Sequence, residues 1–373
     1  MLKELTNLLS KSKDYYFSLL NKKYGIFDFR KFVILFGAAK MAKVYIDLCK
    51  ENKIRVTFLS DNNKTKAGKL LSGFRIISIE DLLKFSKKTQ IIITSIYEEE
   101  IFIQLKSLGF SNVFTHAYFS SVYPEKFTNP YWQNSIAETI KNKEKIVKCF
   151  KLFKDKQSKK TLLELIRYRL FLERNFIKKI AEQQTKEYFD KKIIKLSGEE
   201  IFVDAGAYDG DTVKKFLKIS KGKFAKIYAF EPDAWLFKKL RQSVEDFADK
   251  RIEVLRLGLG KKEERLRFTN DATLGSRIGE KGEIVIKVMP LDKILDERRV
   301  TFIKYDIEGS EYNALLGAKN IIRRYRPKLA ICVYHMTADF WRIPLLIRKF
   351  NSEYRFYLRH YSHFLYGTVC YAV

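Results

Sequence analysis

Residues 203–212 read Val-Asp-Ala-Gly-Ala-Tyr-Asp-Gly-Asp-Thr and mark the point where a short strand turns into a helix. Residues 200–204 predict the strand, because they carry three consecutive apolar side chains, and the helix is expected to begin near Asp211. Gly206 and Gly210 allow the chain to turn tightly and to approach a ligand closely, since glycine lacks a Cβ atom. A strand, a glycine turn and a helix in this order predict a doubly wound α/β sheet.

An acidic residue follows the next predicted strand. Glu231 comes directly after residues 226–230, and an acid at this edge of such a sheet binds ribose hydroxyls. The spacing Asp-x-Gly-x-x-x-Gly differs from the close glycines of a dinucleotide site, and Asp204 places a negative charge where a pyrophosphate would lie. A cationic ligand with an amino-acid tail, such as S-adenosylmethionine, fits better. We expect Gly206 to let its methionine part pass and Glu231 to bind both ribose hydroxyls; an ordinary turn with an incidental acid is the alternative.

Two later strands also end in polar residues. Residues 300–305 are followed by Asp306 and Glu308, and residues 328–333 lead to His335. Because open α/β sheets bind ligands along the carboxyl edge of their strands, these side chains are expected to lie near the glycine turn.

These motifs together resemble the FkbM family of S-adenosylmethionine-dependent methyltransferases over about residues 200–373. The resemblance implies a Rossmann-like class I methyltransferase fold and methylation of hydroxyl oxygens on natural products, glycans or glycolipids. The closing stretch is similar to members from bacterial surface-polysaccharide clusters, although relatives usually carry an acid where Gly367 stands. The matching segments are residues 202–212, 229–232, 290–292, 303–311 and 316–318. The cofactor-binding residues it implies are Asp204, Ala205, Gly206, Ala207, Tyr208, Gly210, Thr212, Glu231 and Asp306.

Methyl transfer to a hydroxyl needs an aligned nucleophile and a destination for its proton. His335 is the predicted base, because a neutral imidazole is available near neutral pH. Asp306 and Glu308 are the other predicted catalytic residues, and they either hold a divalent metal together with the substrate oxygen or line the methionine end of the cofactor. Glu311 is expected to interact favourably with a helix N-terminus.

The first third of the chain predicts a second, smaller Rossmann-like domain over residues 1–117. A strand over residues 31–36, a helix over 44–50 and a strand over 55–59 form a βαβ unit. It resembles nucleotide-sugar-binding domains of bacterial glycan enzymes. Of a glycine fingerprint only Gly37 is present, so binding of a substrate or partner, or a structural remnant, is favoured over a dinucleotide site.

Residues 118–197 show helical periodicity and predict a helical connecting region before the methyltransferase-like domain at residues 198–373. A helical insert that covers the substrate and a plain interdomain spacer are both open.

The composition limits location and partners. Four cysteines without Cys-x-x-Cys spacing fit a reducing compartment, and no apolar run approaches the roughly twenty residues of a membrane span, so a cytoplasmic protein is expected. A formal charge of +28 is expected to attract anionic partners, namely membrane lipids, nucleotide-sugars and phosphate-bearing capsule or lipopolysaccharide intermediates. No nucleic-acid recognition motif accompanies it, so no specific nucleic-acid partner is expected. Exposed helices on βαβ domains are compatible with a homodimer.

The sequence therefore predicts an S-adenosylmethionine-dependent O-methyltransferase that acts on a hydroxyl of a bacterial surface saccharide, of its precursor or of a substituent on it. A non-catalytic nucleotide-sugar-binding or scaffold protein of glycan biosynthesis and an RNA methyltransferase are the alternatives.

Overall fold

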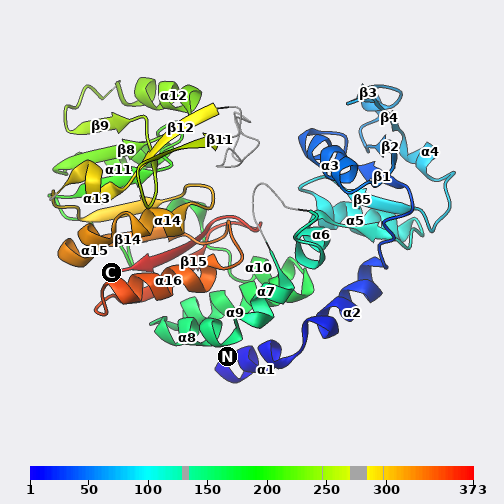
Figure 1. The fold of residues 1–373 in the computed structure, drawn as a ribbon, viewed down its shortest axis with the longest axis horizontal. Coiled ribbons are helices and arrows are strands. Elements are labelled where there is room, and N and C mark those ends of the chain that lie inside the picture. The colour runs from blue at the N-terminus through cyan, green and yellow to red at the C-terminus, as the bar shows by residue number, and fades with distance from the viewer. Residues whose placement is uncertain (128–133, 246, 269–283, 297) are drawn as a thin grey trace.

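The computed structural model describes residues 1–127, 134–245, 247–268, 284–296 and 298–373. Two lobes, each built on a β-sheet, are joined by a group of helices (Figure 1). The α/β fold predicted from the sequence is confirmed.

The N-terminal lobe contains a six-stranded sheet in the order β3-β4-β2-β1-β5-β6. Strands β1 and β5 consist entirely of buried residues, so they are covered on both faces, as is usual for parallel sheets. Only β3 is antiparallel to its neighbour. The strands are β1 Val33–Phe36, β2 Val56–Ser60, β3 Leu70–Leu71, β4 Phe74–Ile77, β5 Gln90–Ile93 and β6 Val113–Phe114. The helical elements of this lobe are α3 Lys40–Glu51, the 3-10 helix Lys64–Lys66, α4 Ile79–Leu82 and α5 Glu98–Ser107.

The C-terminal lobe contains a seven-stranded sheet in the order β15-β16-β14-β13-β7-β8-β9. Five strands are parallel, and the last two of the chain join antiparallel. Three short strands form a separate sheet in the order β10-β12-β11. The strands are β7 Ile201–Ala205, β8 Lys226–Phe230, β9 Ile252–Leu255, β10 Gly258–Leu259, β11 Glu264–Phe268, β12 Ile284–Met289, β13 Phe302–Tyr305, β14 Lys328–Cys332, β15 Phe356–His360 and β16 Thr368–Ala372. The helices are α11 Asp211–Ser220, α12 Ala234–Glu245, α13 Leu291–Leu295, α14 Glu311–Leu316, α15 Lys319–Tyr325 and α16 Asp339–Phe350.

Both faces of the seven-stranded sheet are buried, because successive residues of a strand point to opposite faces. On β13, Ile303 belongs to one apolar cluster and Phe302 to the other. Helix α14 contributes Leu315 to the first cluster, and α11 contributes Phe216 to the second. Helices therefore cover both faces, which leaves the carboxyl edge of the parallel strands for the polar residues.

The helices between the lobes pack on both the N-terminal helices and the second sheet. Helix α9 begins where the Asp155 side chain accepts a hydrogen bond from the Ser158 N–H (2.7 Å), and it packs on the outer edge of β15. There the Leu358 N–H donates to Ser158 Oγ (2.9 Å), and the Lys154 N–H donates to the Phe356 carbonyl (3.0 Å). The helical elements are α1 Leu2–Ser10, α2 Lys13–Tyr24, α6 His116–Val122, α7 Ile136–Lys141, α8 Lys143–Leu152, α9 Lys156–Phe171, α10 Asn175–Lys178 and the 3-10 helix Gln184–Lys186.

The structure adds elements that the sequence does not predict. Helices α1 and α2 contact α8, α7 and α9, so the start of the predicted 1–117 domain packs on the connecting helices. Strands β15 and β16 extend the second sheet beyond β14. The four cysteines are free and buried. Among the described residues, no helix combines the length and the apolar character needed to cross a bilayer.

Candidate active site

The glycine loop lies between β7 and α11, as the sequence predicts. Its backbone bonds to the end of the neighbouring strand β8, because the N–H groups of Gly206 and Ala207 donate to the Phe230 carbonyl at 3.1 and 3.0 Å. Tyr208 and Gly210 adopt left-handed φ values of 51° and 92°. The loop therefore turns sharply at the carboxyl edge of the sheet and delivers the chain to the start of α11.

Gly206 is required by packing inside the protein. Its φ is +72°, and a Cβ atom there would lie 1.8 Å from the carbonyl oxygen of Asp306. The sequence interpretation gives the glycine to the passage of the methionine part of a cofactor. That role stays a prediction, and the structure shows in addition that the glycine lets the loop contact the segment that follows β13.

Glu231 lies beside the glycine loop, at the end of β8. Its Oε2 atom accepts a hydrogen bond from the Tyr208 N–H and its Oε1 atom accepts one from the Asp233 N–H, both at 3.0 Å. Burial raises the pKa of the carboxyl to about 7. Each carboxylate oxygen retains a second lone pair, so the proposed contact with ribose hydroxyls is compatible with this geometry and stays a prediction.

Asp204 faces the interior. It is fully buried, and its Oδ1 atom lies 2.9 Å from Nζ of Lys304, which is the residue opposite to it on β13. Lys304 also donates to the Gly206 carbonyl (2.7 Å). Burial raises the pKa of Asp204 to about 6 and the lysine opposes this shift. Lys304 therefore compensates the charge of Asp204 and both groups fasten the loop, while the binding of a cationic ligand by Asp204 stays a prediction.

Three carboxylates surround His335 at the end of β14. Its Nδ1 atom lies 3.0 Å from Glu311 Oε1, while its Nε2 atom lies 3.4 Å from Glu308 Oε2 and 3.6 Å from Asp306 Oδ1. His335 is 4% exposed and Glu311 is fully buried, whereas about a quarter of the Asp306 and Glu308 side chains is exposed. We call Asp306, Glu308, Glu311 and His335 the acid–histidine cluster; solvent reaches it through its first two members.

The charges of this cluster shift its pKa values. Burial lowers the pKa of His335, but Glu311, Glu308 and Asp306 outweigh burial and raise it to about 10. Burial raises the pKa of Glu308 to about 8, and the other carboxylates add to this shift. The three carboxylates thus favour the protonated ring and oppose the neutral base that the sequence predicts, so the role of His335 as base stays a prediction.

Two tyrosines fix Asp306. The Tyr188 hydroxyl donates to Oδ2 at 2.7 Å, and the Tyr334 hydroxyl donates to Oδ1 at 3.0 Å. Tyr188 belongs to the region predicted to connect the domains, so that region supplies a side chain to the site. A tyrosine in an irregular segment gives no sequence signal for this contact, whereas Lys304 inside the apolar strand β13 does.

The remaining predicted residues support the loop. Ala205 and Ala207 are buried completely, and Thr212 is 5% exposed in the first turn of α11. Gly367, where relatives carry an acid, has a φ of +84°. A Cβ atom there would lie 3.4 Å from Oε1 of Glu187, so a carboxylate already occupies this neighbourhood.

The glycine turn of the N-terminal lobe is internally occupied. The Ala38 N–H donates to Asp61 Oδ2 (2.8 Å), and Lys66 pairs with the same oxygen (2.7 Å). A Cβ atom on Gly37 would lie 2.8 Å from the Thr94 carbonyl oxygen. The turn thus packs against its own lobe, which favours the structural interpretation of this glycine.

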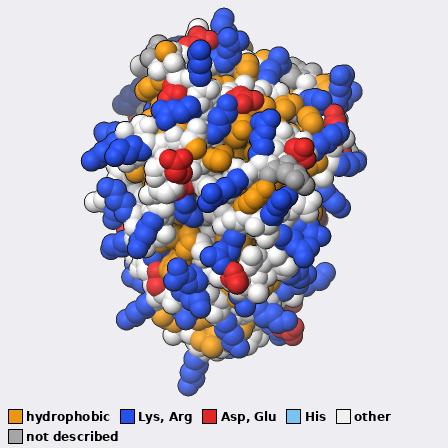
Figure 2. Space-filling view, turned by 90° about the vertical axis from the view of Figure 1, so that its left-hand side faces the viewer, with side chains coloured by type: hydrophobic (Ala, Val, Ile, Leu, Met, Phe, Trp, Pro, Cys, Tyr) orange, Lys and Arg blue, Asp and Glu red, His pale blue; other side chains and the backbone are white. Residues whose placement is uncertain are grey.

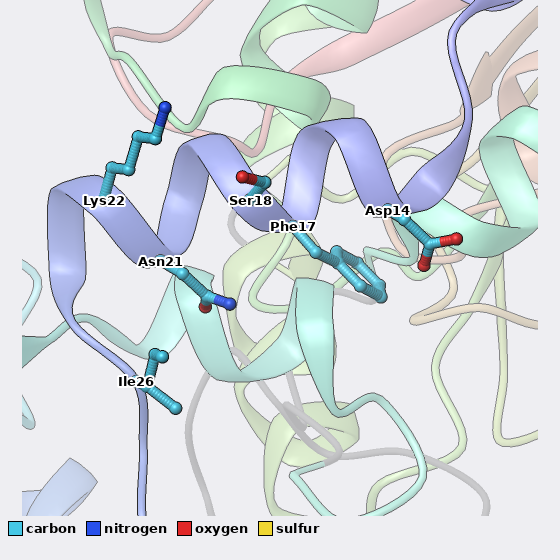
Figure 3. A pocket seen from close by; sticks show the side chains of 6 residues that line it. All are labelled: Asp14, Phe17, Ser18, Asn21, Lys22 and Ile26. Carbon is cyan, nitrogen blue, oxygen red and sulfur yellow. The ribbon is translucent and has the colours of Figure 1, made fainter.

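A hollow of about 440 Å³ lies along α2 (Figure 3). Five of its six lining side chains project from that one helix (Figure 3). It joins no residue of the predicted site. The lining residues are Asp14, Phe17, Ser18, Asn21, Lys22 and Ile26.

Comparison with protein families identifies the second lobe. Residues 204–364 match the family model of the methyltransferase FkbM domain. The chain carries an S-adenosylmethionine-dependent methyltransferase domain. Residues 30–113 match a model described as C2185-like, N-terminal. A search of curated proteins found no match.

A solved methyltransferase structure is similar in fold to nearly the whole chain. The methyltransferase FkbM from Methylobacillus flagellatus KT is 22% identical, with a TM-score of 0.78, and the match covers 96% of this chain and 98% of that chain. Fibrillarin from Aeropyrum pernix, with natively bound S-adenosyl-L-methionine, is 12% identical over 50% of this chain and 72% of that chain, with a TM-score of 0.32. A methyltransferase from Aquifex aeolicus is 16% identical over 54% and 97%, with a TM-score of 0.31.

Proposed function

We propose that this methyltransferase transfers the methyl group of S-adenosylmethionine to a hydroxyl oxygen of a bacterial surface saccharide, of its precursor or of a substituent on it. The observation that carries the proposal is the pair of partly exposed carboxylates, Asp306 and Glu308, beside the glycine loop. Carboxylates accept hydrogen bonds from hydroxyl groups, so this edge suits an alcohol better than an apolar acceptor.

Different residues of the chain bind the cofactor and align the acceptor. S-adenosylmethionine supplies a methyl group on a sulfonium when bound. Glu231 accepts the ribose hydroxyls, and the backbone between Gly206 and Gly210 lines the methionine part. The acceptor oxygen forms its bond to the methyl carbon as the carbon–sulfur bond breaks, and sulfur keeps that electron pair. The hydroxyl proton passes to the ionised form of Glu308, one of the two cluster members that reach solvent, and this form predominates only above its raised pKa of about 8.

The surface charge supports an anionic form of the acceptor. Figure 2 shows Lys and Arg side chains spread over the face of the methyltransferase lobe, with acidic groups scattered between them. The whole chain carries a formal charge of +28. Such a surface attracts nucleotide-linked or phosphate-bearing saccharides and anionic lipids, and raises their association rates at low salt.

A tritium-labelled methyl transfer assay tests the proposal. The acceptors are surface glycans extracted from the source organism and their nucleotide-linked precursors, each with and without chelator. We expect label in a saccharide fraction and at least a tenfold loss with Glu231→Gln, because the charged contacts with the cofactor are lost. Glu245→Gln on the exposed side of α12 is the matched control and should behave as the unchanged protein.

The same assay separates the alternatives. Binding of S-adenosylhomocysteine without transfer to any saccharide fraction would overturn the proposed acceptor. Label in RNA, with binding that weakens steeply as salt increases, would assign the enzyme to RNA instead. Absence of S-adenosylhomocysteine binding by the intact chain would favour a scaffold protein.

A further inference from the structure

The acid–histidine cluster has the composition and the spacing of a metal site. One donor atom from each of Asp306, Glu311 and His335 lies within 4.8 Å of the other two. Donors bound to one transition-metal ion at about 2.0–2.2 Å lie roughly 3–4 Å from each other. Small side-chain adjustments would therefore bring the three atoms around a common ion.

A buried carboxylate oxygen of the cluster lacks a hydrogen-bond partner among the described residues. Glu311 is fully buried, and its Oε2 atom forms no hydrogen bond with any described residue. Both ring nitrogens of His335 face carboxylate oxygens, with Nδ1 3.0 Å from Glu311 Oε1 and Nε2 3.4 Å from Glu308 Oε2. Buried oxygen and nitrogen atoms without partners are costly, and a bound cation satisfies them.

The surrounding charges leave the cluster negative. Asp306, Glu308 and Glu311 face a single imidazole. The nearby cations are engaged elsewhere, because Lys304 pairs with Asp204 and Arg342 pairs with Asp339 at 2.5 Å.

We propose that Asp306, Glu311 and His335 bind one divalent transition-metal ion, with Mn²⁺ or Zn²⁺ as the class that one imidazole and two carboxylates suit. Three protein ligands leave coordination positions open. The role of the ion rests on the proposed function. An acceptor hydroxyl would occupy one open position, where the ion would lower the pKa of that hydroxyl. Glu308 lies 3.4 Å from His335, at the solvent-exposed side of this site.

Binding of Mn²⁺ to the full chain tests the site directly. Paramagnetic resonance reports free Mn²⁺, and titration calorimetry gives the stoichiometry and the affinity. We expect one ion per chain, and at least a tenfold weaker affinity in His335→Gln. His363→Gln in the same lobe is the matched control, since His363 is outside the cluster, and it should leave the affinity unchanged.

S-adenosylhomocysteine binding, measured in parallel, shows whether each variant is folded and separates the two proposals. An unchanged protein that binds S-adenosylhomocysteine but not Mn²⁺ overturns the metal site and leaves the methyl transfer standing. Equal Mn²⁺ affinity in the unchanged protein and in a folded His335→Gln also overturns it. One bound Mn²⁺ lost in His335→Gln, together with no label in any saccharide, supports the metal site and refutes the proposed acceptor.

Discussion

Replacing Gly206 by alanine should disrupt the protein more than the same replacement at a left-handed glycine with open space around it. Gly206 and Gly222 both have a φ of +72°, but a Cβ atom on Gly222 meets nothing within 4 Å. An alanine in this conformation costs about 1–2 kcal/mol at either position. The difference between the two variants therefore isolates the contact of Gly206 with Asp306.

The size of that difference follows from the distance. The added Cβ atom would lie 1.8 Å from the Asp306 carbonyl oxygen, and ordinary contact begins at 3.4 Å, so the two segments must separate by 3.4 − 1.8 = 1.6 Å. Overpacking of this kind costs about 1–3 kcal/mol. Gly206→Ala should thus lose about 2–5 kcal/mol of unfolding free energy, against about 1–2 kcal/mol for Gly222→Ala.

Scanning calorimetry and S-adenosylhomocysteine titration measure both consequences. The extra loss of about 1–3 kcal/mol corresponds to a melting temperature roughly 2–12 °C lower than that of Gly222→Ala. Because the separation displaces Asp306 from the loop, Gly206→Ala should also lose cofactor binding, whereas Gly222→Ala should retain it. Equal melting temperatures and equal affinities for the two variants would refute the reasoning.

The remaining predictions concern two buried acids. The pKa of Glu231 is raised to about 7, and its ionised form binds ribose, so affinity for S-adenosylhomocysteine should increase about tenfold from pH 6 to pH 8. Calorimetry across this range checks the slope, and a slope that persists in Glu231→Gln would contradict the assignment. Lys304→Met leaves the Asp204 carboxylate buried without its cation and should cost about 3–5 kcal/mol of unfolding free energy, most of which Asp204→Asn in the same chain restores. Denaturant unfolding measures both variants, and a loss below about 1 kcal/mol would mean that the pair contributes little.

The parallel core of the fold is readable from the sequence, because its strands are short apolar runs that end in polar residues. Strand β8 has the predicted bounds, and β7 differs by one residue at each end. Strands β15 and β16 escape this pattern, since both of their faces are buried and they join antiparallel after a long helix. Their Thr, Val, Phe and Tyr content was the available signal.

The site was predictable as a set of residues and less so as a set of contacts. Glu231, Asp306 and His335 all follow parallel strands, which places them at the carboxyl edge of the sheet, and His335 lies 3.6 Å from Asp306. The partner of Asp204 could have been inferred, since Lys304 interrupts an apolar strand and a lysine there requires a buried acid. The contact of Tyr188 with Asp306 depends on how the connecting helices fold back on the sheet, and that packing leaves no local pattern.

The packing of α9 on β15 has a consequence for any attempt to produce the methyltransferase lobe alone. The outer edge of β15 bonds to Lys154, to Ser158 and to Glu182, whose N–H donates to the His360 carbonyl at 2.7 Å. A fragment that begins at residue 198 would expose these backbone groups on a strand rich in apolar residues, and such an edge recruits strands from other molecules. That fragment should aggregate, so the connecting helices protect the sheet from self-association and must be retained in any soluble piece of the enzyme.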